Sequence, residues 1–309
     1  MMNMKDVVRA DIYSRQYLSN YENVKFIIFN MDHGGFGAMF ARRKLALQFG
    51  LYFNRVVLFS YGGYVYDEPF EEVSNFTLKD VNKEPLSAFR YETNQSDKVV
   101  YFNFYDYWNR SDIRNKYHER SMFDINFIEF SGILLNSLKL KQEYQDALDI
   151  KTKELLPNNN KIIGLHIRRG DKEVESPFIP VDVYIEELKR IQEATGIGTV
   201  YVCSDSSIAI KELEQKLTGF EIIYDKQENR HNNKINNINM VLESPSLAKI
   251  ETFNCIKNIY LLTKCDYIVG QSNVQFAKLA ACKMSDNLSR LDKHTLINPT
   301  TLQKVIWDD

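Results

Sequence analysis

A cluster of charged residues follows a short apolar run in the second half of the chain. The run spans residues 161–167, and Arg168, Arg169, Asp171 and Lys172 follow it. The guanidinium fork of arginine matches phosphate oxygens in a bidentate manner, and ionised groups that leave water need a partner. On spacing alone, two interpretations are equal: a site for a diphosphate, or a structural network of arginine and aspartate at the end of a strand.

Strand alternation predicts the directions of these side chains. In an extended strand His166 and Arg168 share one face, and Arg169 points to the other. Asp171 is then expected to hold one of the arginines or to bind a ribose hydroxyl. The adhesion tripeptide formed by residues 169–171 is a coincidence, because the flanking apolar strand indicates a buried position.

The loop after this strand adds one cation and two carboxylates. Lys172, Glu173 and Glu175 all lie within residues 172–178. Transfer of a group from a phosphate to a hydroxyl needs a base for the hydroxyl proton and positive charge for the departing phosphate. Glu175 and Lys172 have the chemistry for these two roles. A solvated charged loop is the commoner fate of such a string.

Alternating strand and helix patterns place this cluster at the edge of a parallel sheet. In the second half we predict strands at 161–167, 198–203, 220–224 and 266–270, and helices at 181–194, 208–217, 247–263 and 274–284. In the first half we predict strands at 25–30, 55–59 and 98–104, a helix at 38–49 after a glycine-rich stretch, and one or two helices within 122–156. Ligands of such sheets bind outside the carboxyl ends of the strands, here at 34–37, 168–178, 204–206 and 271–275.

The chain length and one polar break predict two domains. The chain has 309 residues, whereas one α/β domain needs about 150. The run Pro-Asn-Asn-Asn at 157–160 interrupts the helical pattern. We therefore expect an α/β protein of two Rossmann-like domains, with residues 1–157 as the N-terminal domain and residues 158–309 as the C-terminal, nucleotide-binding domain.

At this point a family resemblance emerges from the motif. His-x-Arg-Arg-x-Asp-Lys at 166–172, a following Glu, Phe178, Pro180 and Tyr184 resemble the α1,6-fucosyltransferases, which include the animal enzymes that fucosylate the N-glycan core and the rhizobial nodulation enzymes. Further segments of the family resemble residues 200–206, residues 265–269 with Gln275, and the glycine-rich segment 34–37 with its helix. The similarity is dense over residues 161–285 and thin over residues 65–155.

The resemblance implies a GT-B-like fold with the donor site on the C-terminal parallel sheet and the acceptor on the side of the first domain. It implies an inverting transfer of L-fucose from GDP-β-L-fucose to an oligosaccharide hydroxyl, α1,6 to a GlcNAc-type acceptor. The implied donor-binding residues are His166, Arg168, Arg169, Asp171, Tyr184, Asp205, Asn258 and Gln275. The implied catalytic residues are Glu175 as general base, Lys172 and Arg168, and the loop near the cleft contains Gly35 and Gly37.

This chain departs from the family pattern at several of these positions. Asn258 falls where the animal enzymes have an Asp that contacts guanine, and Ser206 replaces a second Asp. The loop after Lys172 is one residue shorter than in the animal enzymes. Alignment from Phe178 backwards selects Glu175 as the base, whereas counting from Lys172 leaves Glu173 as a rival.

Several other classes are excluded by motif and composition. Phe40 fills the third glycine position of a dinucleotide fingerprint, and no P-loop motif is present. The 39 basic and 41 acidic residues give a net charge of -2, without the basic excess of a nucleic-acid binder. The histidines lack metal-ligand spacing, and the resemblance implies no metal and no other cofactor, because Arg168, Arg169 and Lys172 supply the positive charge.

The expected location is cytoplasmic, because the sequence contains neither a signal peptide nor an apolar run of the ~20 residues that span a bilayer. The four cysteines are expected to be reduced. Two alternatives stay open: an α1,2-fucosyltransferase or other GDP-sugar transferase, although Lys172 occupies a position that is usually aromatic in the α1,2 enzymes, and a non-catalytic protein that binds a sugar nucleotide or glycan.

Overall fold

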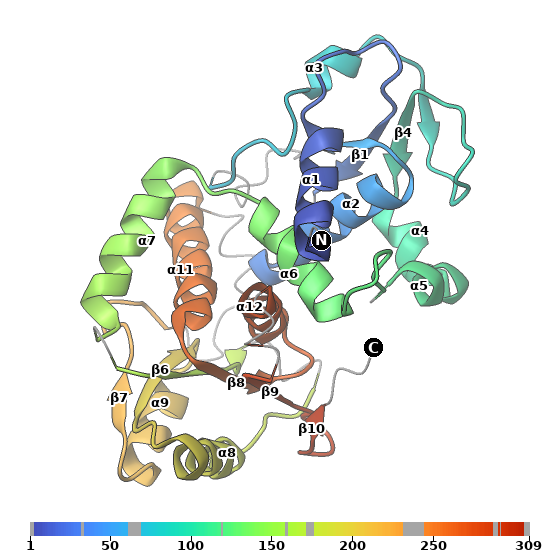
Figure 1. Ribbon diagram of the computed structural model, residues 1–309. Helices are drawn as coiled ribbons and strands as arrows, with labels where there is room; N and C mark the ends of the chain where they lie inside the picture. Colours follow the sequence, from blue (N-terminus) through green and yellow to red (C-terminus); the bar gives the residue numbers. More distant parts are fainter. Residues whose placement is uncertain are drawn as a thin grey trace.

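The computed structural model describes residues 3–31, 34–60, 69–118, 120–157, 160–170, 176–230, 244–286, 290 and 292–305. These residues form two separate β-sheets with helices between and around them (Figure 1). The GT-B-like α/β architecture expected from the sequence is therefore present, with one sheet from each half of the chain.

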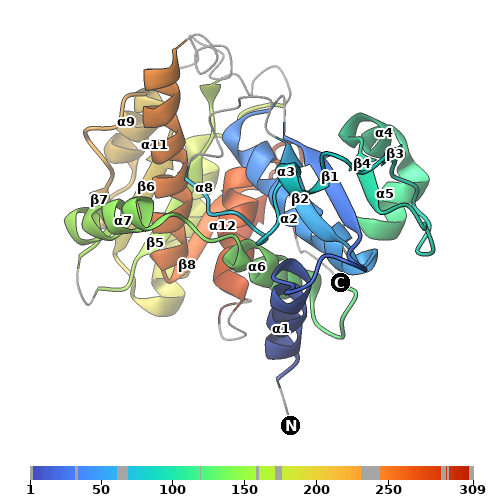
Figure 2. The ribbon, with the colours of Figure 1, turned by 90° about the horizontal axis from the view of Figure 1, so that it is seen from above.

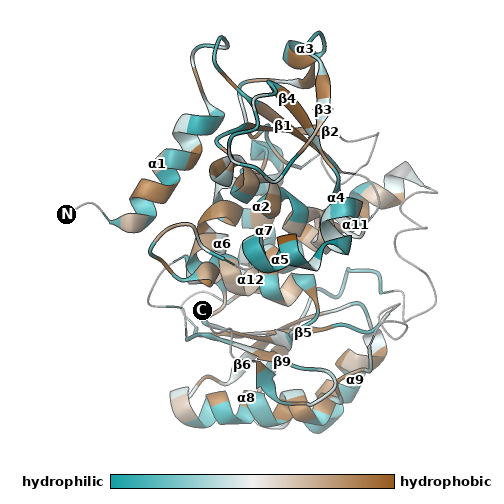
Figure 3. Ribbon diagram, turned by 90° about the vertical axis from the view of Figure 1, so that its right-hand side faces the viewer, coloured by the Kyte–Doolittle hydropathy of each residue, from teal (hydrophilic) through white to brown (hydrophobic). Residues whose placement is uncertain are grey.

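The first sheet is parallel throughout and has the strand order β2-β1-β4-β3. Its strands are β1 (Phe26–Asn30), β2 (Val56–Ser60), β3 (Leu86–Ala88) and β4 (Val99–Phe102). The helices of this half are α1 (Met4–Gln16), α2 (Phe36–Tyr52), α3 (Leu78–Val81), α4 (Phe104–Asn109), α5 (Ser111–Tyr117), α6 (Phe127–Ser137) and α7 (Gln142–Leu155). The strands of this sheet are mainly brown in Figure 3, as expected for apolar strands covered by other elements.

The second sheet has the order β10-β9-β8-β5-β6-β7, and only its edge strand β10 is antiparallel. Its strands are β5 (Ile163–Ile167), β6 (Thr199–Ser204), β7 (Glu221–Ile223), β8 (Tyr267–Gln271), β9 (His294–Ile297) and β10 (Lys304–Val305). The accompanying helices are α8 (Val181–Thr195), α9 (Ser207–Lys216), α11 (Pro245–Lys264) and α12 (Gln275–Ser285). Helices α8 and α9 cover one face of the sheet, and α11 and α12 cover the other (Figure 1).

Strand β5 marks the topological switch point of the second sheet. The chain moves from β5 to β6 and β7 on one side, and then crosses to β8 and β9 on the other. A crevice opens outside the carboxyl ends of the strands at such a point, and ligands of open α/β sheets bind there. The residues after β5 therefore occupy the place that the fold itself prepares for a ligand.

Helices from both halves of the chain form the layer between the two sheets. Helix α12 packs against α6 and α2, and α7 packs against α11 (Figure 2). Phe36 at the start of α2 lies 6.3 Å from Phe276 of α12, measured between ring centroids. One hydrophobic core consequently runs from the first sheet to the second. The domain boundary at residue 157 stays a prediction.

Most predicted elements are confirmed, with corrections at their ends. Helix α2 begins at Phe36, so that Gly37 lies in its first turn and not in a loop. The strand expected to reach Phe104 ends at Phe102, because Asn103 caps α4 by accepting hydrogen bonds from the amides of residues 105 and 106. The region 122–156 contains two helices, α6 and α7. The strands β3, β9 and β10 and the helices α1, α3, α4 and α5 were not predicted.

Within the described part of the chain, no helix is both long and apolar enough to cross a membrane.

Candidate active site

An ion pair joins the carboxyl ends of β5 and β6. The Arg168 guanidinium donates to Asp205 Oδ2, and the backbone N–H of Arg169 donates to Asp205 Oδ1 over 2.9 Å. Ile167 lies opposite Ser204 in the ladder, so residues 168 and 205 meet directly beyond the strands. Asp205 thus holds an arginine, a role that the sequence offered to Asp171, which lies outside the described residues.

The chain turns at Gly170 immediately above this ion pair. Gly170 has φ +52°, which is the left-handed region. A Cβ atom on Gly170 would overlap Asp205 Oδ2 and lie 3.3 Å from Arg168 Nη1. Only glycine combines this conformation with this close approach. The glycine in the Arg-Arg-Gly-Asp motif is therefore needed to let the backbone cross the ion pair.

Arg169 points to the opposite side of the strand, as alternation predicts, and is buried. Its Nη2 donates to the carbonyl of Ile179 over 2.7 Å, and its guanidinium lies 4.9 Å from the ring centroid of Phe178. Burial lowers the pKa of Arg169 from its ordinary value. Tyr184 on α8 is fully buried, and burial raises the pKa of its hydroxyl, whereas the positive charge of Arg169 opposes this shift.

His166 is buried on the other face, against α12. Its ring stacks on Phe276 with centroids 5.5 Å apart and an interplanar angle of 18°. Burial, followed by the positive charge of Arg168, lowers the pKa of His166 to about 3. The imidazole is consequently neutral at physiological pH, with one ring nitrogen able to donate and the other to accept a hydrogen bond.

Unsatisfied polar atoms gather at this edge of the sheet. Four buried side-chain atoms around the carboxyl ends of β5 and β8 lack a hydrogen-bond partner among the described residues: His166 Nδ1, Arg169 Nη1, Tyr184 Oη and Gln271 Oε1. Buried polar groups are nearly always hydrogen-bonded in native proteins. This concentration of donors and acceptors, beside two guanidinium groups, therefore fits a polar anionic ligand.

Two side-chain hydrogen bonds in series link the end of β8 to the loop that follows β5. Gln271 Nε2 donates to Asn273 Oδ1 over 2.6 Å, and Asn273 Nδ2 donates to Ser176 Oγ over 2.9 Å. Sequence reasoning flagged residues 271–275 as a region to inspect but did not select Gln271 or Ser176. The candidate catalytic residues Lys172 and Glu175, and the rival Glu173, lie outside the described residues, between Gly170 and Ser176.

Asn258 belongs to a buried polar group between β6 and α11. Its Nδ2 donates to Glu228 Oε1 over 3.0 Å, and the hydroxyl of Tyr201 lies 3.4 Å from its Oδ1. Lys257 forms ion pairs with both Glu228 and Asp225. Burial raises the pKa of Glu228, and the charge of Lys257 opposes this shift. A carboxylate therefore accompanies Asn258, although position 258 itself carries none.

Arg230 adds another guanidinium to this edge. Its Nε donates to the carbonyl of Ser204 over 3.1 Å, and its Nη2 donates to the carbonyl of Asp225 over 2.9 Å. It thereby caps the carboxyl end of β6. The sequence analysis did not select Arg230 and Glu228, because both fall in the polar stretch between the strand predicted at 220–224 and the helix predicted at 247–263, where no periodic pattern marks them.

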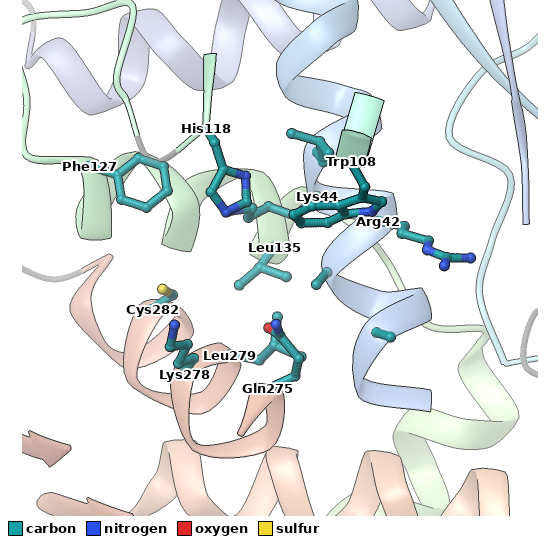
Figure 4. A pocket seen from close by; sticks show the side chains of 13 residues that line it. Arg42, Lys44, Trp108, His118, Phe127, Leu135, Gln275, Lys278, Leu279 and Cys282 are labelled. Carbon is teal, nitrogen blue, oxygen red and sulfur yellow. The ribbon is translucent and has the colours of Figure 1, made fainter. Parts of the chain in front are cut away.

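Helix α2 of the first half reaches this site through its first turn. A Cβ atom on Gly37 would lie 3.0 Å from both Gln275 Cβ and the ring of Phe276, so the missing side chain allows this close approach. Gly35 is the N-cap of α2, and a Cβ there would meet nothing within 4 Å. Gln275 is exposed at the start of α12 and lines a cavity between the halves (Figure 4).

Three comparisons with known proteins bear on this site. A family model described as alpha-(1,6)-fucosyltransferase N- and catalytic domains matches residues 116–288, which is more than half of the chain. None of the curated proteins matches the chain.

Solved structures of fucosyltransferases have the same fold. NodZ alpha-1,6-fucosyltransferase soaked with GDP-fucose has a TM-score of 0.55 and 16% identity, over 91% of this chain and 99% of that chain. NodZ from Bradyrhizobium has a TM-score of 0.51 and 15% identity, over 84% of this chain and 92% of that one.

A mutant of FUT1 from Arabidopsis thaliana in complex with GDP has a TM-score of 0.54 and 12% identity, over 96% of this chain and 75% of that one. At these identities the structures establish the fold, and the family model establishes the membership. The chain belongs to the alpha-(1,6)-fucosyltransferase family.

Proposed function

We propose that this protein is an inverting glycosyltransferase that moves L-fucose from GDP-β-L-fucose to a hydroxyl group of an oligosaccharide, by α1,6 transfer to a GlcNAc-type acceptor. Its family makes it a GDP-fucose-dependent fucosyltransferase. The inversion, the linkage and the acceptor are the parts of the proposal that go beyond the family.

The observation that supports the proposal most strongly is the pair of arginines after β5. Arg168 is held in place by Asp205, and Arg169 keeps one buried Nη1 without a partner. A guanidinium that is fixed before the ligand arrives loses little entropy on binding a diphosphate bidentately. The same preorganised charge stabilises the diphosphate as it departs.

The proposed reaction is a single displacement. The acceptor hydroxyl oxygen forms a bond to the anomeric carbon as the bond from this carbon to the diphosphate breaks, and the electron pair of the broken bond leaves with GDP. Glu175 accepts the hydroxyl proton, and the positive charge of Lys172 stabilises the departing phosphate. In the sequence, both residues lie between Gly170, where the backbone passes over the ion pair, and Ser176, which accepts a hydrogen bond from Asn273. The proposed reaction uses no metal ion, because Arg168, Arg169 and Lys172 offset the negative charge of the phosphates.

We propose that the two halves of the chain bind different substrates. Residues 158–309 bind the donor with the second sheet, and residues 1–157 contribute to acceptor binding.

Among the described residues, no cluster of three or more His, Cys, Asp or Glu side chains could hold a metal ion.

A donor panel tests the proposal. The protein is incubated with radiolabelled GDP-fucose, GDP-mannose, UDP-GlcNAc and CMP-sialic acid, each with a set of GlcNAc-terminated oligosaccharides and excess chelator. We expect transfer from GDP-fucose alone, with full activity in chelator and an α-linked product by NMR. Transfer from a different nucleotide sugar, or activity that requires added manganese, would refute the corresponding part of the proposal.

Two isosteric variants test the base. Glu175→Gln should lower turnover by about 10²–10⁴-fold, the usual contribution of a general base, without changing GDP affinity. Glu173→Gln is the matched control in the same loop. If Glu173→Gln loses turnover and Glu175→Gln keeps it, Glu173 is the base. If both keep it, the base lies outside this loop.

A further inference from the structure

A cavity of about 290 Å³ lies between the two halves of the molecule. Helices α2, α6 and α12 form its walls, and the segment of α4 and α5 lies across it (Figure 4). Leu45, Phe127, Leu135 and Leu279 provide its apolar lining, and Trp108, His118 and Gln275 provide polar atoms. Concave sites with an apolar lining and a few converging polar groups are typical of ligand pockets.

All charged side chains among the described residues that line this cavity are basic, namely Arg42, Lys44 and Lys278. A second, more open cavity shares Trp108 and His118 with it. Its other lining residues in the described part of the chain include Arg114 and Arg120, and again no carboxylate. The whole chain has a net charge of -2, so the excess of basic side chains among the described lining residues is a local feature. Cavities lined by one sign of charge raise the local concentration of the opposite ion.

Aromatic rings hold two of these cations in place. The Arg42 guanidinium lies 5.0 Å from the ring centroid of Phe104, and Lys44 Nζ lies 4.7 Å from that of Phe127. Lys44 Nζ is also 3.4 Å from Ser131 Oγ. Because these contacts restrain the cations next to the cavity, binding an anion there costs less side-chain entropy.

Trp108 supplies a flat apolar surface at the junction of the two cavities. Its side chain is 40% exposed, although large aromatic residues are normally well buried. His118 contacts it at 5.4 Å between centroids with an interplanar angle of 68°, and Arg114 lies 5.9 Å from its ring centroid. The electron-rich ring face favours partially positive C–H groups such as those of a sugar ring.

The cavity adjoins the proposed donor site at one end. Gln275 lines the cavity, and the next residue, Phe276, stacks on His166 beside Arg168. Along α12, Gln275, Lys278 and Cys282 follow at helical spacing and face the same cavity (Figure 4). A sugar in the cavity can therefore point one hydroxyl toward the donor edge while its other substituents contact the cations.

We propose that this cavity binds the acceptor and that the acceptor is an anionic oligosaccharide. A sugar ring lies on Trp108, and a negatively charged substituent, either a carboxylate or a sulfate ester, pairs with Arg42 and Lys278. This inference rests on the proposed function, because it takes the adjoining edge of the sheet to be the donor site.

Direct titration tests the inference without requiring turnover. The probes are chitotriose, 6-O-sulfated chitotriose and a trisaccharide with a terminal uronic acid, titrated into the full chain by calorimetry in the presence of GDP. We expect the anionic probes to bind about tenfold more tightly than chitotriose at low salt, with the difference shrinking at higher ionic strength because salt screens partly exposed charges. The sulfated and uronic probes separate the two sources of charge.

Matched variants locate the binding. Lys278→Gln and Arg42→Gln should each weaken the anionic probes by about threefold to tenfold, as expected for one partly desolvated charge contact, and leave chitotriose unchanged. Trp108→Ala should weaken all three probes. Lys189→Gln on α8, the same charge change on the far face of the second sheet, should change nothing.

Equal affinity for neutral and anionic probes, no binding of any probe, or equal effects of Lys189→Gln and Lys278→Gln would overturn the inference. GDP affinity, measured in the same samples, keeps the two proposals apart. If the wild-type chain binds GDP but shows no preference for anionic probes, only the acceptor inference is refuted. If the wild-type chain does not bind GDP, the proposed donor site is refuted.

Discussion

At the scale of single residues, the candidate site combines two arginines in different electrostatic settings. Arg168 is paired with Asp205 and remains partly exposed, whereas Arg169 is buried between Phe178 and the carbonyl of Ile179. The carboxylate of Asp205 positions Arg168, whereas packing on Phe178 and the hydrogen bond to Ile179 position Arg169. Their removal should therefore have different costs for the fold, although both should weaken the binding of a diphosphate.

The neutral state of His166 predicts an acid-sensitive fold. Its pKa is lowered to about 3, so below about pH 6.5 the unfolded chain binds a proton that the folded chain does not. This contribution to stability is present above pH 6.5 and is lost as pH falls toward 3, by up to about 1.4 kcal/mol per pH unit.

Urea unfolding of the wild type and of His166→Gln between pH 7 and pH 4.5 measures this effect. The acid slope that is due to the histidine should be missing in the variant, and the carboxylates contribute equally to both proteins. Parallel pH profiles of the two proteins would contradict the assigned neutral imidazole.

The turn at Gly170 predicts a binding defect that differs from a simple loss of stability. Gly170→Ala and Gly196→Ala both place a side chain at positive φ, which costs roughly 1–2 kcal/mol. Only at position 170 would the added Cβ overlap Asp205, because nothing lies within 4 Å of a Cβ at position 196. We expect Gly170→Ala to have the lower melting temperature, because displacement of Asp205 adds to the backbone cost that both variants share, and we expect a loss of GDP affinity of about tenfold or more in Gly170→Ala alone. Equal GDP affinities would show that the Arg168–Asp205 pair does not contribute to the donor site.

The sequence motif indicated these residues, but not their partners. His166, Arg168 and Arg169 were selected from one strand, and their opposite directions follow from strand alternation. The partner of Arg168 was not predictable in this way, because Asp205 is 37 residues away and becomes its neighbour only when β5 and β6 pair. Glu228 and Arg230 were not selected, because they lie in a polar stretch and reach their partners Asn258 and Ser204 only in the folded chain.

At the scale of elements, strand β5 and helix α11 position the two ends of the proposed donor site. Strand β5 delivers the arginines to the switch point, and α11 delivers Lys257 and Asn258 to the layer beneath β6. Apolar periodicity predicted both elements, because β5 is buried at every position and α11 is long. Short elements such as β3, β10 and α3 have too few residues for a periodic signal, and the isolated buried positions Val8 and Ile12 gave none for α1.

The buried carboxylate next to Asn258 predicts a role in recognising the base. Guanine presents two neighbouring N–H donors, which a carboxylate accepts well, and Glu228 is the carboxylate that contacts Asn258. Glu228→Gln should weaken GDP binding several-fold and reduce the preference for GDP over ADP. Asp225→Asn is the matched control, because Asp225 also pairs with Lys257. If calorimetry gives the same GDP affinity for both variants, Glu228 has no part in base binding.

At the scale of the whole molecule, the two sheets and the helical layer between them create the site. Both halves contribute to the surroundings of the site, because the first turn of α2 packs against Gln275 and Phe276 next to His166. The sequence predicted two α/β halves from length and from the break at 157–160. It could not predict that α6 and α7 would pack against α12 and α11, since such packing depends on side chains that are distant in sequence.

The central claim is that Arg168 and Arg169 form a diphosphate site at the carboxyl end of β5. The most direct measurement is calorimetric titration of GDP into the wild type, Arg168→Ala, Arg169→Ala and the control Arg190→Ala, whose arginine pairs with Glu187 on the surface of α8. We predict a loss of GDP affinity of about tenfold or more in each of the first two variants, and poor rescue by lysine, which lacks the bidentate fork. Circular dichroism verifies the fold of each variant. GDP affinity that is unchanged in both folded variants would contradict the account.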